Sequence, residues 1–192
     1  KMIIPLAANE KAAQIPDDIK YSSALLTGSA HIQTYGDTNG TITEKDGYET
    51  LVLGSRGKGK RLEAITLNFN NTTGYQGEIE YRVHRQTYGW TNWMKSTMQA
   101  GTVGQAKRLE GITITVDNPK YSGGIRYKTH VQSFGWMNWA ENGELSGTYG
   151  RAKRLEAIQI ELTGEMKNHY DIYYRVHAQS FGWLGWAKNG ES

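Results

Sequence analysis

Apolar and polar residues alternate in three short stretches of the chain, each directly behind the sequence Arg-Leu-Glu. The alternating apolar positions are Ile65, Leu67 and Phe69 in the first stretch, Ile112, Ile114 and Val116 in the second, and Ile158, Ile160 and Leu162 in the third. A period of two places every second side chain on the same face of a β-strand. We therefore expect three strands, each with one face buried in a core.

Each unit also predicts a second strand with two unlike faces. Its apolar face carries Ile79, Tyr81 and Val83; Ile125, Tyr127 and Val131; and Ile172, Tyr174 and Val176. The other face carries a basic residue, His, Gln, an aromatic residue and Trp in file: Arg82, His84, Gln86, Tyr88 and Trp90; Lys128, His130, Gln132, Phe134 and Trp136; Arg175, His177, Gln179, Phe181 and Trp183. This mixture is not a second core face.

A glycine precedes the first Trp of each file, at Gly89, Gly135 and Gly182. Glycine inside a strand pattern predicts a bulge or a tight bend, so we assign these residues a structural role. A second Trp follows three positions later in each copy. Residues three apart on a regular strand face opposite ways, so we expect one Trp of each pair to be buried and one to be accessible.

Both patterns belong to one internal repeat. His84, His130 and His177 begin the blocks HRQTYGWTNW, HVQSFGWMNW and HAQSFGWLGW, which lie 46 and 47 residues apart and contain all six Trp residues. The blocks GKGKRLEAI, GQAKRLEGI and GRAKRLEAI recur in step with them. We divide the repeats into residues 57–103, 104–149 and 150–192.

An earlier, degenerate copy is expected in residues 21–56. The sequence AHIQTYGD repeats the His, Gln, aromatic and Gly positions, but Asp37 and Gly40 stand where the two Trp residues should be. Residues 1–20 match nothing later and are interpreted as a leader or linker. The chain opens at Lys1 without a start residue, so we expect an upstream segment to have been removed.

Three complete units of similar length favour a closed, pseudo-threefold, all-β domain over residues 21–192, either β-prism-like or β-trefoil-like. Closure protects strand edges, which an open array of hairpins would have to cap. The amino-acid composition does not alter the prediction of an all-β domain. The chain has 192 residues, 22 basic and 19 acidic residues, a net charge of +3 and no cysteine. Disulfides and thiolate metal sites are therefore excluded, and neither nucleic-acid binding nor a membrane span is expected.

Catalysis is not expected from a chain whose polar candidates are triplicated, because an active site needs a unique, convergent set of groups. No Ser-His-Asp, GxSxG or HExxH pattern is present. No cofactor or metal is expected either: the repeated His residues are too far apart in sequence for a local site, although three symmetric His side chains could meet on a threefold axis.

The Arg and Glu of each repeated block lie two residues apart on the same strand face. These residues are Arg61 and Glu63, Arg108 and Glu110, and Arg154 and Glu156. We assign them to the scaffold, since a buried carboxylate requires a hydrogen-bonding partner. The other interpretation is that the Arg side chains contact a ligand.

The candidate ligand surface consists of the His, Gln and Trp residues of the three full copies: His84, Gln86, Trp90 and Trp93; His130, Gln132, Trp136 and Trp139; His177, Gln179, Trp183 and Trp186. Indole faces stack on sugar rings, and His and Gln supply orienting hydrogen bonds. Two alternatives stay open. The Trp pairs could pack in the core, or they could form a surface that captures a protein.

The combined pattern of RLEAI, His-x-Gln-x-aromatic-Gly-Trp-x-x-Trp and the NGE turn resembles the ChW repeat, the clostridial hydrophobic repeat with a conserved Trp. The third and fourth copies follow the family pattern closely. The second has MKSTMQAGTVG in place of the NGE turn, and the first lacks the Trp pair. The resemblance implies a secreted or surface-attached protein of a Gram-positive anaerobe with a binding role. We therefore expect a non-catalytic extracellular module that binds carbohydrate or, alternatively, captures a host or partner protein as a surface adhesin.

Overall fold

The computed structural model describes residues 26–69, 78–117 and 121–169, together with four short strands between residues 173 and 188. The described residues form β-strands and one 3-10 helix, which confirms the all-β class.

The strands and the helix have the following bounds: β1 Leu26–Ile32, β2 Gly36–Asn39, β3 Thr41–Lys45, β4 Tyr48–Gly54, β5 Leu62–Phe69, β6 Glu78–Arg85, β7 Gly89–Trp90, β8 Met94–Lys95, β9 Ala100–Gly101, β10 Leu109–Asp117, β11 Ile125–Val131, β12 Gly135–Trp136, β13 Ala140–Glu141, β14 Ser146–Gly147, β15 Leu155–Leu162, η2 Gly164–His169, β16 Tyr173–Tyr174, β17 His177–Ala178, β18 Gly182–Trp183 and β19 Ala187–Lys188.

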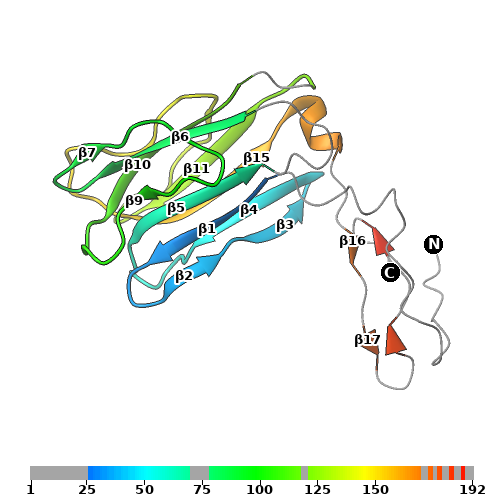
Figure 1. Cartoon of the computed structure of the whole chain (residues 1–192), viewed down its shortest axis with the longest axis horizontal. Coiled ribbons are helices and arrows are strands. Elements are labelled where there is room, and N and C mark those ends of the chain that lie inside the picture. The colour runs from blue at the N-terminus through cyan, green and yellow to red at the C-terminus, as the bar shows by residue number, and fades with distance from the viewer. Residues whose placement is uncertain are drawn as a thin grey trace.

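Three antiparallel sheets repeat one arrangement (Figure 1). In each, a strand that ends near the repeated His pairs with a strand that follows Arg-Leu-Glu: β1 with β5, β6 with β10, and β11 with β15. The register is the same each time, with His31 opposite Ala64, His84 opposite Gly111, and His130 opposite Ala157. Each sheet therefore joins the His strand of one copy to the Arg-Leu-Glu strand of the next.

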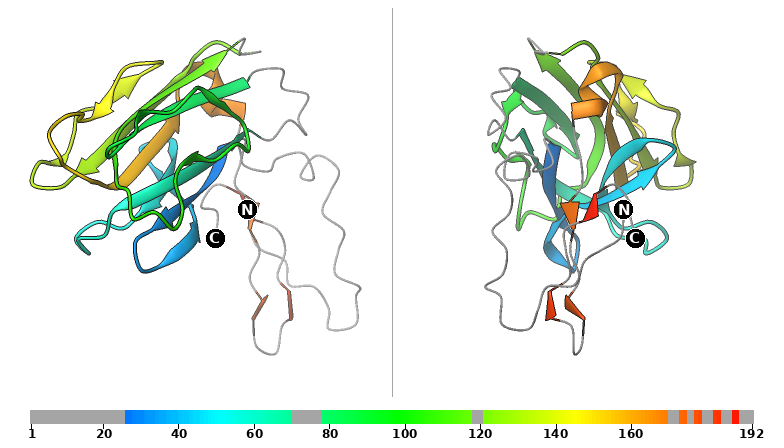
Figure 2. Two further views of the ribbon diagram at one scale, coloured as in Figure 1. Left: turned by 60° about the vertical axis from the view of Figure 1, so that its left-hand side comes forward. Right: turned by 90° about the vertical axis from the view of Figure 1, so that its right-hand side faces the viewer.

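A third strand completes each sheet and closes the molecule. β9 pairs with β5 and β14 pairs with β10, while β15 receives β4, which comes from the degenerate first copy. The central strands β5, β10 and β15 all contact one another, and Figure 2 shows the sheets from two further directions around this centre. Three packed sheets agree with the β-prism-like alternative rather than with a trefoil of hairpins.

Alternating apolar side chains of the three sheets fill a single core. The predicted residues Ile79, Tyr81 and Val83 of β6 are fully buried, as are their counterparts on β11. The Arg-Leu-Glu strands also bury side chains from both faces near their beginnings. The core thus takes one face of each His strand and leaves its other face outside, which is what positions the candidate site.

Two buried tyrosines tie neighbouring sheets together. The hydroxyl of Tyr81 on β6 accepts the backbone N–H of Leu67 on β5 at 2.9 Å, and Tyr127 on β11 accepts that of Ile114 on β10 at 3.0 Å. Burial raises the pKa of both hydroxyls, that of Tyr127 to about 12. In the first copy Gly28 occupies the equivalent position and lacks this side chain.

The fourth His block forms its own short hairpins. His177 lies opposite Trp183, and Tyr173 lies opposite Lys188, in the registers of the second and third copies. Within the described residues these strands pair only with one another. The three larger sheets contain the His strands of the first three copies, β1, β6 and β11, and β1 belongs to the degenerate copy.

Candidate functional site

Each His strand turns back on itself before it reaches the first Trp. β6 ends at Arg85, and Thr87 and Gly89 adopt left-handed φ values of 72° and 70°. Trp90 then returns on β7 directly opposite His84. The prediction that His84, Gln86 and Trp90 follow one another along one face of a single strand is therefore wrong. The bend expected at Gly89 is a hairpin, and it brings the imidazole and the indole together from paired strands.

None of the four Trp side chains in the second and third copies is buried. Trp93 is 41% exposed, while Trp90, Trp136 and Trp139 are partly exposed. The expectations of one buried Trp in each pair, and of core packing for it, are wrong for these copies. The physical reason is that Tyr81 and its neighbours already fill the inner face, so the hairpin returns over the outer face.

Basic side chains stack on the indole rings instead. The Arg82 guanidinium carbon lies 4.9 Å from the Trp90 ring centre and 4.6 Å from that of Trp93. In the third copy the Lys128 ammonium takes this place, 5.4 Å from Trp136 and 4.4 Å from Trp139. Cations over aromatic faces attract the ring quadrupole and hold the rings in place. In the described part of the chain neither Arg82 nor Lys128 has an acidic partner at ion-pair distance.

The third copy continues this stacking further across its sheet. The Arg126 guanidinium lies 4.8 Å from the Trp139 ring centre and 4.1 Å from that of Tyr48. The Lys167 ammonium follows at 4.2 Å from the same tyrosine. Arg126 is also paired with a carboxylate, Glu161, at 2.6 Å. Cations and aromatic rings therefore alternate along the outer face of this sheet.

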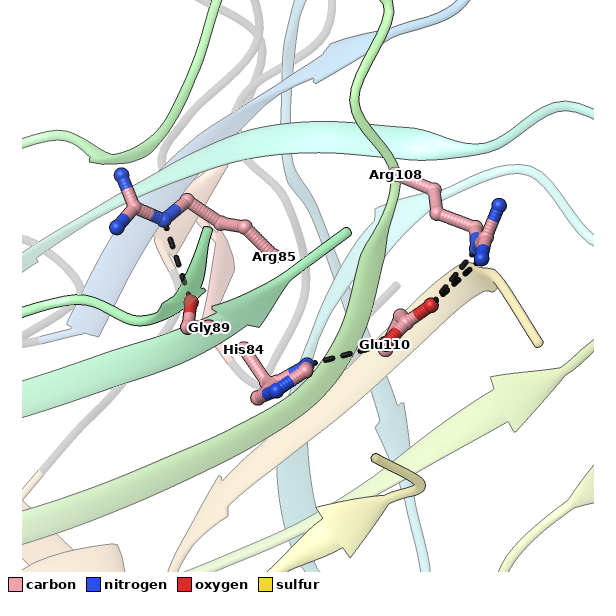
Figure 3. A network of polar contacts seen from close by, with 5 residues as sticks. All are labelled: His84, Arg85, Gly89, Arg108 and Glu110. Atoms are coloured by element: carbon pink, nitrogen blue, oxygen red, sulfur yellow. Dashed lines mark hydrogen bonds and ion pairs between the residues drawn. The ribbon is translucent and has the colours of Figure 1, made fainter. Parts of the chain in front are cut away.

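A buried glutamate joins the repeated His to the repeated Arg, as Figure 3 shows for the second copy. Glu110 is almost fully buried; one carboxylate oxygen accepts from Nε and Nη2 of Arg108 at 2.9 and 2.8 Å. The other oxygen lies 3.1 Å from Nδ1 of His84, at an angle outside hydrogen-bonding geometry. The third copy repeats this group with Arg154, Glu156 and His130, the last at 3.0 Å.

The arrangement orients the imidazole on the outer face. Arg108 compensates the cost of burying the Glu110 carboxylate. Nδ1 of His84 is enclosed against that carboxylate, while the ring meets Trp90 edge-on at 5.4 Å. The His130 ring meets Trp136 in the same way at 5.4 Å. Each hairpin thus presents an imidazole, two indoles and a cation side by side.

Comparison with known proteins identifies these hairpins. Two segments, residues 84–118 and 130–164, match the family model ChW, Clostridial hydrophobic W. The chain carries ChW repeats. Each matched segment begins at the repeated His near the end of one strand, and continues through the hairpin and the Arg-Leu-Glu strand that follows it. No curated protein and no solved structure matches the chain.

ChW repeats are non-catalytic modules found in surface and secreted proteins of clostridia. No helix in the described part of the chain is long and apolar enough to cross a membrane. Residues 26–69, 78–117 and 121–169 contain no cluster of His, Asp and Glu side chains that could hold a metal. His84 and His130 lie on different sheets and each faces its own buried glutamate, so these two do not meet; the side chain of His177 lies outside the described residues.

The glutamines of the two matched ChW repeats lie at the hairpin turn rather than in file with the His. The backbone N–H of Gln86 donates to the Arg108 carbonyl at 3.0 Å, and that of Gln132 donates to the Arg154 carbonyl at 3.0 Å. They thereby join each hairpin turn to the start of the neighbouring strand. In the fourth copy, His177, Gly182 and Trp183 lie in described strands, while Gln179 and Trp186 fall outside the described residues.

The first copy has different chemistry at the same place. Asp37 lies opposite His31, in the register that Trp90 and Trp136 occupy in the ChW repeats. Its carboxylate lies 2.7 Å from Nδ1 of His31. With a carboxylate in place of the indole, this copy has a polar depression next to Gln99 where the other two have an aromatic surface.

The stacking cations and one tyrosine are absent from the candidate residues named from sequence. Arg82 and Lys128 precede the His by two residues, and strict alternation places them on the His face. Tyr149, which is 60% exposed, comes from the next copy, and its ring centre lies 6.0 Å from that of His84. It borders a groove lined also by Met137 and Leu145. The repeat pattern does not show which side chains of neighbouring copies contact each other, so Tyr149 could not be predicted as part of this site from the sequence.

Proposed function

We propose that this chain is a non-catalytic extracellular module that binds carbohydrate through the outer faces of its ChW hairpins. The observation that carries the proposal is the outward position of the Trp pairs. Burying an indole is a large source of folding free energy, yet Trp93 keeps 41% of its surface exposed. Side chains of this kind that stay accessible are typical of binding surfaces.

The groups at each hairpin suit a sugar ring. An indole offers a flat apolar face to the C–H side of the ring. Because Nδ1 of His84 is enclosed against Glu110, Nε2 is the ring atom left for a sugar hydroxyl. Arg82, stacked on both indoles, fixes their orientation before a ligand arrives and lowers the entropy lost on binding.

The sites are separate and equivalent, which supports a ligand that itself repeats. The second-copy site lies on β6 and β7 of one sheet, and the third-copy site lies on β11 and β12 of another. A polysaccharide that contacts both gains avidity from individually weak contacts. A single protein partner would instead be expected to contact one continuous patch.

One observation favours the second candidate, a surface adhesin module that captures a protein. Leu145 and Tyr149 are 41% and 60% exposed beside His84, and with Met137 they line one groove. Tyrosine and arginine are enriched in protein-binding hot spots, and Arg151 lines the same groove.

A pull-down on bacterial cells and on plant-wall material decides between the two. The labelled chain would be applied to material treated with periodate, which oxidises vicinal diols, or with protease. We expect binding to survive protease and to be lost after periodate. Loss after protease alone would overturn the carbohydrate proposal and support protein capture through the groove at Tyr149.

A further inference from the structure

Three crossover loops gather at one end of the prism. Residues 54–61, 101–108 and 147–154 each lead from the third strand of one sheet to the Arg-Leu-Glu strand of the next. The backbone bonds repeat: Ser55, Thr102 and Thr148 donate to the carbonyls of Glu156, Glu63 and Glu110, and the hairpin residues Gln33, Gln86 and Gln132 donate to the carbonyls of Arg61, Arg108 and Arg154. The crossover loops and the turns of the first three His hairpins therefore share this end, toward the left of Figure 1.

This end is strongly basic. The crossover loops and hairpin turns carry ten basic residues and one acidic residue, Asp37; the basic residues are Arg56, Lys58, Lys60, Arg61, Arg85, Lys107, Arg108, Arg151, Lys153 and Arg154. Arg61, Arg108 and Arg154 are paired with the buried glutamates. Within the described ranges, the other seven have no carboxylate at ion-pair distance.

An aromatic residue lies about half exposed at each hairpin turn, at Tyr35, Tyr88 and Phe134 with 51%, 50% and 48%. Lysine side chains cover the two tyrosines. The Lys60 ammonium lies 5.9 Å from the Tyr35 ring centre, and that of Lys107 lies 5.5 Å from the Tyr88 ring centre.

The three lysines are held by the turns themselves. Lys60, Lys107 and Lys153 donate to the hydroxyls of Thr34, Thr87 and Ser133 at 3.2, 3.3 and 3.2 Å. The hydroxyl-bearing residues have left-handed φ values of 70–75°. An ammonium group has three donors, so each keeps donors for a ligand. A lysine ammonium held by a turn hydroxyl therefore occurs three times around this end of the molecule.

The opposite end has the opposite charge balance. The far ends of the strands and their connections carry seven acidic residues, Glu44, Asp46, Glu49, Glu78, Glu141, Glu144 and Glu165, against Lys45, Lys95, Arg126 and Lys167. The near-neutral net charge of the chain therefore conceals a separation of charge along the prism. A field of one sign over one end concentrates ligands of the other sign there.

We propose that the basic end binds an acidic polysaccharide. The lysine and arginine side chains would contact its carboxylates, and the aromatic residues of the turns would contact its sugar rings. An ammonium group beside each tyrosine ring disfavours burying that ring in a lipid layer, because the charge would lose its water. The surface adjoins the Trp sites on the sheet faces, since Tyr149 of one crossover loop lies 6.0 Å from His84 between ring centres, but the proposal does not rest on those sites.

The test uses the full chain with polygalacturonate as the acidic probe and its fully methyl-esterified form as the uncharged control. The triple variant Lys60→Gln, Lys107→Gln and Lys153→Gln removes the fixed cations. The matched variant Lys45→Gln, Lys95→Gln and Lys167→Gln removes the same charge from the opposite end. Circular dichroism and thermal melting confirm that each variant is folded, and affinity electrophoresis measures binding.

We expect the unmodified chain to bind polygalacturonate, to prefer it to the methyl ester, and to bind less tightly as salt is raised. The basic-end variant should lose about tenfold or more in affinity, because it removes three charge contacts to the ligand at once. The matched variant should keep its affinity. Equal binding by both triple variants, no preference over the methyl ester, or tighter binding to duplex DNA or anionic vesicles would overturn the proposal.

Discussion

Single residues decide whether the Trp pairs form a surface or a core. Tyr81 and Tyr127 occupy the inner face, where each hydroxyl accepts a backbone N–H of the neighbouring sheet. With that face filled, the indoles lie outside and stack on Arg82 or Lys128. The same position is Arg in one copy and Lys in the next, so the stack requires a cation rather than a particular donor geometry.

Replacing Arg82 with Ala should therefore destabilise the fold by about 1 kcal/mol through loss of the stacked cation and its packed stem. Arg82→Lys, which copies the third repeat, should change stability by less than about 0.5 kcal/mol. Urea unfolding monitored by Trp fluorescence measures both variants. Equal losses for Ala and Lys would show that charge over the rings is not what matters.

The buried tyrosine hydroxyls support a second residue-scale prediction. Tyr127→Phe leaves the N–H of Ile114 buried without its acceptor, and we expect a loss of about 1–3 kcal/mol. Tyr149→Phe, an exposed tyrosine, is the control and should be neutral.

Stability of the unmodified chain should also fall as the pH rises from about 10 to 12. In that window a tyrosine ionises in the unfolded chain, whereas burial keeps Tyr127 neutral in the fold by raising its pKa to about 12. A flat profile of the free energy of unfolding across this window would contradict the burial of these hydroxyls.

Among the elements, sequence alone predicted the straight strands well and the hairpins poorly. The period of two correctly placed Ile112 and Ile114 in the core, because an extended strand must alternate. The same rule failed beyond Gln86, where left-handed φ values at Thr87 and Gly89 reverse the chain. A threonine in the sequence does not indicate a left-handed φ, so the pairing of His84 with Trp90 could not be predicted and was seen only in the structure.

The closing strands depend on glycines that touch the backbone of the Arg-Leu-Glu strands. A Cβ on Gly54 would lie 2.4 Å from the carbonyl oxygen of Glu156, at a φ of +93°. We expect Gly54→Ala to destabilise the fold by about 3 kcal/mol or more, through clash and backbone strain together. Gly47→Ala, at a φ of +74° with open space around it, isolates the strain and should cost about 1–2 kcal/mol. Thermal unfolding compares the two, and equal shifts would contradict the close packing of β4.

For the molecule as a whole, the sequence predicted a closed domain with threefold symmetry. It did not predict which strand closes the third sheet. Repeat counting favoured three full copies ending at Ser192. The structure closes instead with β4, from the degenerate copy, against β15. A signal was present: GSRGKGKRLE before the first block has the same glycines as GTVGQAKRLE and GTYGRAKRLE.

This closure predicts which part of the chain folds alone. A fragment of residues 21–169 should melt cooperatively as a monomer, since it contains all three closed sheets. A fragment of residues 57–192 lacks β1 and β4, leaves β5 and β15 each without one of their two neighbouring strands, and should aggregate or remain unfolded. Circular dichroism with analytical ultracentrifugation distinguishes the two, and the reverse outcome would show that the fourth copy, not the first, closes the prism.

The most direct test of the outward-facing Trp sites is the double variant Trp93→Ala and Trp139→Ala, compared with the unmodified chain for binding to periodate-sensitive wall material. We expect a melting temperature within a few degrees of that of the unmodified chain, because neither indole belongs to the core. We also expect at least about a tenfold loss of binding, because two stacking contacts are removed. Full binding by a folded variant, or collapse of the fold, would contradict the claim that these residues form the ligand surface.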